Sequence, residues 1–503
     1  MASIIAKSNS VILAIDQGTT GTRAFLFDRA GRVVSQRYRE LTQHFPKPGW
    51  VEHDPDEILR STWHVIADAL RQARRPAASV AAIGITNQRE TTILWDRRTG
   101  RAVGRAIVWQ CRRSAPLCDA LRRRGLEPMI RRKTGLVLDA YFSGTKIRWM
   151  LEHHRGLAAR ARAGDIAFGT VDSWLLWHLT GGASHATDET NASRTLLYNI
   201  RTRRWDDELL RRLRIPRAIL PAVKPSSAEF GVTAQAGPLP AGIPITGVAG
   251  DQQAALVGHG CLKPGEAKNT YGTGCFLLLN TGRKPVTSRH GLLTTLAYGG
   301  SAKPCYALEG SVFIAGAAIQ WLRDRLQLIR TAAETEQIAR RVPSTGGIYV
   351  VPAFVGLGAP YWDMEARGAI VGLTRGSTRD MIVRSTLESL AYQTADVVDA
   401  MQRDAGVRLS RLQVDGGAAQ NNWLMQFQAD LLGIDVVRPR MTANTAKGAA
   451  LLAGIGLGWW RPQRLDGLMG AIDRVFHPRM PAAERRRLYA GWQDAVQRVR
   501  THH

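Results

Sequence analysis

The chain has 503 residues, of which 45% are hydrophobic, enough for a large core divided over two or more domains. Its formal net charge at pH 7 is +26, which makes nucleic-acid binding a class of function to consider. The N-terminus has no signal-peptide pattern, no apolar stretch approaches the roughly 20 residues of a transmembrane helix, and the five cysteines form no zinc or disulfide pattern, so we expect a soluble, cytoplasmic protein with no membrane insertion.

The basic residues are spread along the whole chain. Short runs of arginine and lysine occur at residues 74–75, 122–124, 131–133, 203–204 and 485–487. Few aromatic residues that could stack on bases are interleaved with them. This pattern favours solvated basic faces and predicts no nucleic-acid partner, with nucleic-acid binding kept as the alternative that the net charge suggests.

The first half of the chain has the pattern of a mixed α/β layer. Apolar runs and turn residues predict strands over residues 10–15, 22–27 and 32–38, joined as an antiparallel meander. The pair Asp54-Pro55 is typical of a helix start, and apolar residues follow it at helical spacing. A further buried strand is predicted over residues 81–86.

The second half repeats this order of elements. Residues 244–249 predict a strand that ends just before Asp251, and the glycine-punctuated segment 269–274 precedes another apolar strand. A long amphipathic helix is predicted over residues 378–404, followed by a short strand and a glycine turn at residues 415–417. The repetition indicates a duplicated fold.

The boundary between the two halves is predicted near residue 255. This division gives an N-terminal lobe, residues 1–255, and a C-terminal lobe, residues 256–503. Each lobe contains one glycine-containing turn of the type that binds phosphate, at residues 16–23 and 269–274. A nucleotide between two such lobes would be shielded from water when they close.

Two turns have the composition of phosphate-binding loops. Residues 16–23 (DQGTTGTR) join the first two predicted strands, and glycines, hydroxyls and backbone amides suit close approach to phosphate oxygens. By itself this turn fits an ordinary hairpin equally well, but residues 269–274 (NTYGTG) provide a second copy. Neither turn follows the P-loop or the dinucleotide-binding glycine pattern.

Several longer segments resemble the FGGY carbohydrate kinase family. They are residues 46–55 (PKPGWVEHDP), 84–92 (GITNQRETT), 109–113 (WQCRR), 141–149 (YFSGTKIRW), 250–255 (GDQQAA) and 356–362 (GLGAPYW). The resemblance extends from residue 11 to about residue 460. It implies an α/β fold of duplicated actin-like (ribonuclease H-like) ATPase domains with a nucleotide cleft between two lobes. It also implies that the N-terminal lobe carries most of the substrate site and the C-terminal lobe the adenosine site. Within the family, the chain resembles the members that phosphorylate glycerol to sn-glycerol 3-phosphate with ATP and Mg²⁺.

The resemblance implies that Asp251 is the general base that takes the proton from the attacking hydroxyl. One positioned carboxylate suits phosphoryl transfer, because this reaction requires little covalent chemistry from the protein. From the sequence alone, a helix N-cap is the stronger interpretation of Asp251, since it follows a strand and a glycine.

The substrate site implied by the resemblance contains seven residues: Arg89, Glu90, Trp109, Tyr141, Asp251, Gln252 and Phe276. Arg89 and Glu90 would supply a charged donor and acceptor for the hydroxyls of glycerol, and Trp109 and Phe276 would pack on its carbon chain. Without the resemblance, an exposed ion pair and ordinary core packing are the simpler explanations of these residues.

The nucleotide-binding residues implied by the resemblance are Thr19, Thr20, Gly21, Arg23, Thr273, Gly316, Gln320, Gly417 and Asn421. Gly316 and Gly417 could also be a helix-packing and a β-turn glycine. Asp16 is expected to hold Mg²⁺ through waters, with a strand-end turn cap as its alternative. The family usually has two serines where this chain has Gly21-Thr22, so an altered nucleotide affinity is expected.

Two alternatives to glycerol phosphorylation stay open besides nucleic-acid binding. Another FGGY kinase, acting on a ketopentose, an aldonate or a four-carbon polyol, would use the same base and nucleotide site. An actin-like assembling ATPase would also fit a duplicated fold. The resemblance further predicts a homo-oligomer, either a dimer or a tetramer.

Overall fold

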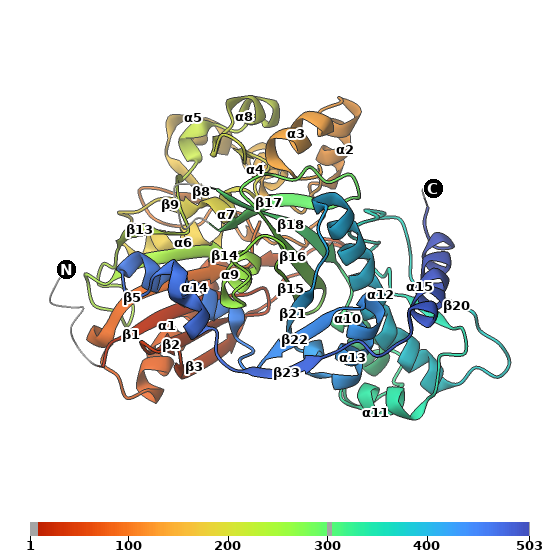
Figure 1. Cartoon of the computed structure of the whole chain (residues 1–503). Helices are drawn as coiled ribbons and strands as arrows, with labels where there is room; N and C mark the ends of the chain where they lie inside the picture. The colour runs from red at the N-terminus through yellow and green to blue at the C-terminus, as the bar shows by residue number, and fades with distance from the viewer. Residues whose placement is uncertain (1–8, 299–303, 502–503) are drawn as a thin grey trace.

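The structure, a computed structural model, describes residues 9–298 and 304–501 and is built around two β-sheets with helices packed on their faces (Figure 1). The first sheet has the strand order β13-β14-β5-β1-β2-β3. Its strands are β1 (Val11–Gln17), β2 (Gly21–Phe27), β3 (Val33–Glu40), β5 (Val80–Asn87), β13 (Ser227–Val232) and β14 (Pro244–Gly250). β1, β2 and β3 form the predicted antiparallel meander, and β5 and β14 extend it in parallel.

The second sheet repeats this plan with the order β17-β18-β16-β15-β21-β22-β23. Its strands are β15 (Ala267–Tyr271), β16 (Cys275–Gly282), β17 (Leu293–Tyr298), β18 (Cys305–Val312), β21 (Arg411–Gly416), β22 (Asp435–Pro439) and β23 (Ile472–Phe476). β15, β16 and β18 pair antiparallel, while β21 and β22 continue the sheet in parallel beyond β15. Each sheet therefore has three antiparallel strands followed by two parallel ones, which confirms the predicted duplicated α/β fold.

The helices connect and cover these strands. They are α1 (Pro55–Gln72), α2 (Ala115–Arg123), α3 (Glu127–Thr134), α4 (Ser143–His153), α5 (Leu157–Ala163), α6 (Val171–Leu179), α7 (Glu189–Ala192), α8 (Asp207–Leu213), α9 (Asp251–Gly258), α10 (Gly316–Asp324), α11 (Glu334–Arg341), α12 (Arg379–Ala405), α13 (Asn422–Leu432), α14 (Asn444–Leu457) and α15 (Ala482–Gln497). Among the described residues, no helix combines the length and hydropathy needed to span a bilayer.

Within the described residues, five two-stranded sheets complete the fold. They pair β4 (Glu52–His53) with β7 (Ala106–Ile107), β6 (Ile93–Asp96) with β8 (Ile166–Gly169), β9 (Ala186–Asp188) with β12 (Ala222–Lys224), β10 (Tyr198–Asn199) with β11 (Arg204–Trp205), and β19 (Tyr349–Val351) with β20 (Ala369–Val371). Most of these short strands lie between β5 and β14 in the chain, so they belong to the large insertion that stands above the first sheet (Figure 1).

The first helix starts where the sequence predicts it. Asp54 is the N-cap of α1, its carboxylate accepts from the backbone N–H of Asp56 at 2.9 Å, and Pro55 is the first helical residue. An acidic cap and a proline at this position satisfy the unpaired N–H groups of a helix start. Ile58 and Ile66 are fully buried against the first sheet, as the helical spacing predicts.

The helix α14 belongs to the second half of the chain but covers the first sheet. Ile12 and Ala14 of β1 pack against Ala446 and Ala450 of α14, whereas Val11 and other odd-numbered residues of β1 face α1 and α6. In Figure 1 this blue helix lies beside the red and orange strands of the first sheet. β1 is consequently buried on both faces, as its continuous apolar sequence indicates. The division at residue 255 stays a prediction.

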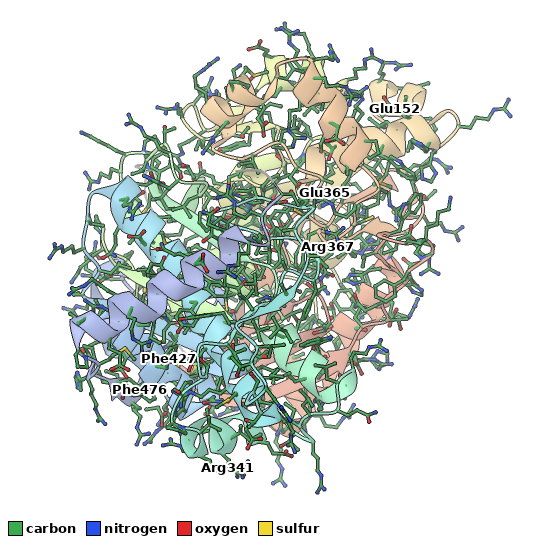
Figure 2. The ribbon with its side chains drawn as sticks, turned by 90° about the vertical axis from the view of Figure 1, so that its right-hand side faces the viewer. Glu152, Arg341, Glu365, Arg367, Phe427 and Phe476 are labelled. Atoms are coloured by element: carbon green, nitrogen blue, oxygen red, sulfur yellow. The ribbon has the colours of Figure 1, made fainter. Side chains whose placement is uncertain are left out.

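The basic side chains are dispersed over the surface. Figure 2 shows nitrogen-tipped side chains projecting around the whole outline of the molecule, with Arg341 at its lower edge. Many of them pair with a nearby acid, as Arg341 does with Asp380. Exposed pairs of this kind contribute little to stability.

The C-terminal helix α15 is anchored by a buried carboxylate of α12. Asp396 accepts from Tyr489 Oη at 2.7 Å and from Trp492 Nε1 at 2.8 Å. Burial raises the pKa of Asp396 to about 7, against the lowering effect of these hydrogen bonds. An unfolded aspartate has a pKa of about 3.9. Between about pH 4 and about pH 7 the folded protein therefore keeps a proton on Asp396 that the unfolded chain has lost. The stabilisation from this protonation is complete below about pH 4 and is lost as the pH rises through about 7.

We therefore expect wild-type protein to lose stability relative to Asp396→Asn between pH 5 and pH 8, by on the order of 2 kcal/mol. Thermal unfolding of both proteins across this range measures the effect, and titrations shared by the two cancel in the difference. Parallel dependence of both Tm values on pH would contradict the prediction.

Candidate functional site

The first phosphate-type turn joins β1 to β2 at the edge of the first sheet. Gly18 N donates to Gly21 O at 2.9 Å, which closes the turn and leaves Thr19 half-buried and Thr20 exposed. Asp16 lies directly before the turn and pairs across the hairpin with Arg23, whose Nη1 is 3.4 Å from the Asp16 carboxylate. The turn thus presents hydroxyls and backbone beside a carboxylate and a guanidinium.

The structure explains why residue 21 is a glycine. A Cβ atom built on Gly21 would lie 2.3 Å from the ring of Tyr38 and 2.5 Å from the carbonyl of Arg39. Tyr38 Oη donates to Thr20 O at 3.1 Å, and Arg23 stacks over the same ring with its guanidinium carbon 5.0 Å from the centroid. Tyr38 therefore occupies the space that a serine side chain at position 21 would need.

Two carboxylates lie at the same edge of the sheet. β1 and β14 both run parallel to β5, so Asp16 at the end of β1 and Asp251 directly after β14 emerge on one side. Burial raises the pKa of Asp16, Arg23 lowers it, and the neighbouring charge of Asp251 raises it again. Thr86 of β5 lies opposite both Asp16 of β1 and Ala249 of β14, which brings Asp16 and Asp251 to the same edge of the sheet.

These two carboxylates fit a magnesium ion. Across residues 9–298 and 304–501, no group of three or more His, Cys, Asp or Glu has metal-binding geometry. Mg²⁺ is usually held by one or two carboxylates together with waters and substrate phosphates, so a pair of acids beside a phosphate-type turn is sufficient for it.

Asp251 is the first residue of α9 and faces Arg89. Its Oδ1 is 3.2 Å from Arg89 Nε and also accepts from the N–H of Gln252 at 2.7 Å. The N-cap of α9 is Gly250, so Asp251 does not occupy the N-cap position that the sequence alone suggests. Its side chain is 29% exposed, which makes it the accessible carboxylate of the site.

A ring of four buried charges lies beside Asp251. It consists of Arg89 and Glu90 after β5, Arg194 after α7, and Glu309 in β18. Arg89 makes a bidentate pair with Glu309 at 2.6 and 2.9 Å, and Arg194 contacts both Glu90 at 2.6 Å and Glu309 at 2.9 Å. All four side chains are at most 2% exposed, so Arg89 and Glu90 are not the exposed pair that the sequence alone suggests.

The backbone of Glu90 is held in an unusual conformation. Its φ is +63°, in the left-handed region that a residue with a side chain seldom adopts. The carbonyl of Glu90 accepts from Ser143 Oγ at 3.0 Å and from Lys146 Nζ at 3.1 Å, and Lys146 also donates to the carbonyl of Tyr141 at 2.5 Å. Burial lowers the pKa of Lys146 to about 7. Lys146 thereby ties two predicted substrate residues to α4.

Three aromatic rings form a wall at the site. The ring centroid of Trp109 is 5.5 Å from that of Tyr141 and 6.1 Å from that of Phe276, with both pairs near edge-to-face. Trp109 and Phe276 are only partly buried, so each has a face available. Trp109 Nε1 donates to Thr19 Oγ1 at 2.8 Å, which joins this wall to the first phosphate-type turn.

Gln252 is linked to the second sheet by a buried lysine. Lys268 of β15 donates to Gln252 Oε1, to Thr270 Oγ1 at 3.0 Å and to the carbonyl of Phe276 at 3.1 Å. Burial lowers the pKa of Lys268 to about 8. The seven predicted substrate residues thus lie together, with contributions from both halves of the chain.

The second phosphate-type turn lies against the start of α10. The N–H of Gly316 donates to the carbonyl of Gly272 at 3.0 Å, and the carbonyl of Thr273 accepts from Ala315 and Ala317. Thr273 is exposed at the tip of the turn, and Gln320 is exposed one helical turn further along α10. The structure therefore brings together three of the predicted nucleotide residues.

The remaining two predicted nucleotide residues follow β21. Gly416 pairs with Tyr271 of β15, which sets the turn containing Gly417 beside the second phosphate-type turn. Asn421 caps α13 by accepting from Leu424 N at 2.9 Å, and its amide donates to Thr335 Oγ1 at 3.1 Å. Its side chain thus has a structural role in this arrangement.

Four buried charged residues of the site were not predicted from the sequence: Lys146, Arg194, Lys268 and Glu309. A signal exists for Glu309, because it interrupts the largely apolar strand β18, and a buried charge requires a partner. Nothing in the sequence indicates which partners they have.

Comparison with known proteins gives the same assignment along the whole chain. Residues 11–258 match the N-terminal domain of the FGGY family of carbohydrate kinases, and residues 267–457 match its C-terminal domain. The chain is 57% identical over 489 residues to a glycerol kinase of Petrotoga mobilis, covering 97% of this chain and 98% of that one. It is 57% identical over 487 residues to glycerol kinase 2 of Thermotoga maritima, covering 97% and 98% respectively.

Comparison with solved structures agrees with the match to the two FGGY domains. The structure of Plasmodium falciparum glycerol kinase with ADP superposes with a TM-score of 0.91 at 38% identity, over 97% of this chain and 98% of that one. A gluconate kinase from Lactobacillus acidophilus has a TM-score of 0.88 at 22% identity, over 98% and 99%, which shows the shared fold. With both domains matched and full-length relatives well above 50% identity, the chain belongs to the FGGY family of carbohydrate kinases.

Proposed function

We propose that this protein phosphorylates glycerol with ATP to give sn-glycerol 3-phosphate, the first step of glycerol catabolism. The observation that carries the proposal is the 55–58% identity to eight curated glycerol kinases over 97% of the chain. The TM-score of 0.91 to a glycerol kinase with ADP supports a nucleotide substrate. We also infer a cytoplasmic homo-oligomer, a dimer or a tetramer.

Asp251 is the proposed general base. Its carboxylate accepts the proton of a terminal hydroxyl as that oxygen forms a bond to the γ-phosphorus, and the bond from the γ-phosphorus to the β–γ bridging oxygen breaks to release ADP. The position of Asp251 supports this role, because it is accessible, starts a helix, and contacts the buried Arg89.

Asp16 is the proposed residue on the magnesium side. A bound Mg²⁺ would neutralise charge on the phosphate oxygens of ATP. The burial of Asp16 directly before the first phosphate-type turn supports this position, because Mg²⁺ is typically held by one or two carboxylates together with waters and substrate phosphates.

Glycerol binding is proposed for Arg89, Glu90, Tyr141 and Gln252, with Trp109 and Phe276 against the carbon chain. The charged pair offers one strong donor and one strong acceptor for hydroxyls. The rings offer an apolar surface, since the only side-chain donor of Trp109 already donates to Thr19.

The nucleotide is proposed to lie between the two turns. Thr19, Thr20, Gly21 and Arg23 would face its phosphates from the first sheet, and Thr273 from the second. Gly316, Gln320, Gly417 and Asn421 would border the adenosine. The proximity of α10 and β21 to the second turn supports this arrangement.

We expect kcat/KM for glycerol to exceed that for xylulose, gluconate or erythritol by at least about 100-fold, because a longer substrate brings hydroxyls that the aromatic wall cannot pair. Purified enzyme with MgATP, assayed by ADP release and by product analysis, tests this. Equal or better turnover of one of the other substrates would replace glycerol by that substrate and leave the kinase assignment in place.

A further inference from the structure

The orientation of the Arg89 guanidinium is fixed by its contacts. Both of its terminal nitrogens are bound by the two carboxylate oxygens of Glu309, at 2.6 and 2.9 Å. A planar guanidinium in a bidentate pair with a carboxylate has a fixed plane as well as a fixed position. The remaining nitrogen, Nε, consequently points between Asp251 at 3.2 Å and Glu90 at 3.9 Å.

The residue that fixes this orientation belongs to the other sheet. Glu309 lies in β18, opposite Leu278 of β16, whereas Arg89 follows β5 of the first sheet. The other oxygen contacts of Glu309 extend the effect, because Arg194 binds Glu309 with Nη2 and Glu90 with Nε. One carboxylate of the second sheet thus holds both charged residues of the proposed glycerol site.

Stability alone is a weak explanation for these charges. Taking four charged groups out of water costs several kcal/mol for each ion, and well-packed apolar residues are often at least as stabilising as buried ion pairs. Glu309 is 0% exposed and is flanked in β18 by the buried residues Leu308 and Gly310, so an apolar residue would suit this position. A role in arranging the site accounts for the charge.

We propose that Glu309 is a positioning residue for substrate binding: it aims Arg89 Nε at the substrate oxygens beside Asp251, and through Arg194 it fixes Glu90. Since Arg89 and Glu90 are the proposed hydroxyl ligands, this inference rests on the proposed function. It assigns part of the substrate selectivity to a residue that itself touches no substrate.

The variant Glu309→Gln tests the proposal. Glutamine has the same shape, but its amide nitrogen would oppose an arginine N–H, so the bidentate grip on Arg89 is lost. We expect the KM for glycerol to rise at least about 10-fold and the KM for ATP to change less than about twofold. An unchanged KM for glycerol, or an equal rise for both substrates, would overturn the proposal.

Glu388→Gln is the matched control. Glu388 of α12 is also a buried carboxylate paired with an arginine, with Arg384 Nε at 2.8 Å and Tyr392 Oη at 3.2 Å. Neither of these hydrogen bonds involves a proposed site residue. Both variants should lower Tm, and only Glu309→Gln should raise the KM for glycerol; the same KM change in both would reduce Glu309 to a structural residue.

The double variant Arg194→Met with Glu309→Gln separates orientation from charge balance. It removes one charge of each sign, so the buried cluster is again neutral and the protein should fold even where Glu309→Gln alone does not. We expect a KM for glycerol at least as high as in the single variant. Recovery of the wild-type KM would show that Glu309 supplies only charge. Failure of the wild-type enzyme to phosphorylate glycerol would instead refute the proposed function.

Discussion

Replacement of Asp251 by asparagine is expected to lower kcat by about 10²- to 10⁴-fold while binding of glycerol and nucleotide stays nearly normal. Asparagine keeps the size of the side chain and can accept a hydrogen bond, but it cannot take the proton from the attacking hydroxyl. The measurement is steady-state kcat together with calorimetric titration of glycerol and of a non-hydrolysable ATP analogue.

Asp494→Asn provides the comparison for this experiment. Asp494 is an exposed carboxylate of α15 that pairs with Arg498 at 2.9 Å. Its replacement also removes one negative charge, at a position distant in sequence from every proposed site residue. The value of kcat should therefore not change. A near-normal kcat for Asp251→Asn would exclude Asp251 as the base.

Replacement of Gly448 by alanine is expected to destabilise the protein by about 3 kcal/mol or more, at the upper end of overpacking costs. A Cβ atom at this position of α14 would lie 1.8 Å from the carbonyl of Ala254, in α9. The obstacle is backbone, so a helix must move, and α9 begins with Asp251. We therefore expect a lower Tm and a lower kcat in the surviving folded enzyme, measured by calorimetry and by activity at saturating substrates.

Gly467→Ala is the control for the effect of an added methyl group. A Cβ atom on Gly467 would meet nothing within 4 Å. Tm and kcat should both stay near the wild-type values. A Gly448→Ala protein with wild-type Tm would show that α9 and α14 are loosely packed, contrary to the structure.

Local sequence patterns predicted the elements of this fold well. The meander, the start of α1 and the long helix α12 all depend on neighbouring residues, such as the cap Asp54 or the apolar repeat of an amphipathic helix. The two phosphate-type turns were visible for the same reason. The duplication followed because the same local order appears twice.

Contacts between distant segments could not be predicted in this way. Glu309 and Arg89 are 220 positions apart, and no local pattern pairs them. Likewise, Gly21 suggested only an altered nucleotide affinity, and the tertiary structure alone shows that Tyr38 fills the space that a side chain at position 21 would need. The packing of α14 on the first sheet had no sequence signal either, since its alanines fit any buried helix.

The position of α14 has a consequence for synthesis on the ribosome. The face of β1 and β2 that contains Ile12, Ala14, Phe25 and Phe27 has no cover until α14 is made. At a translation rate of about 5–20 residues per second, the roughly 200 residues between β14 and α14 take about 10 to 40 s. Throughout that interval the native cover of this apolar sheet face does not yet exist.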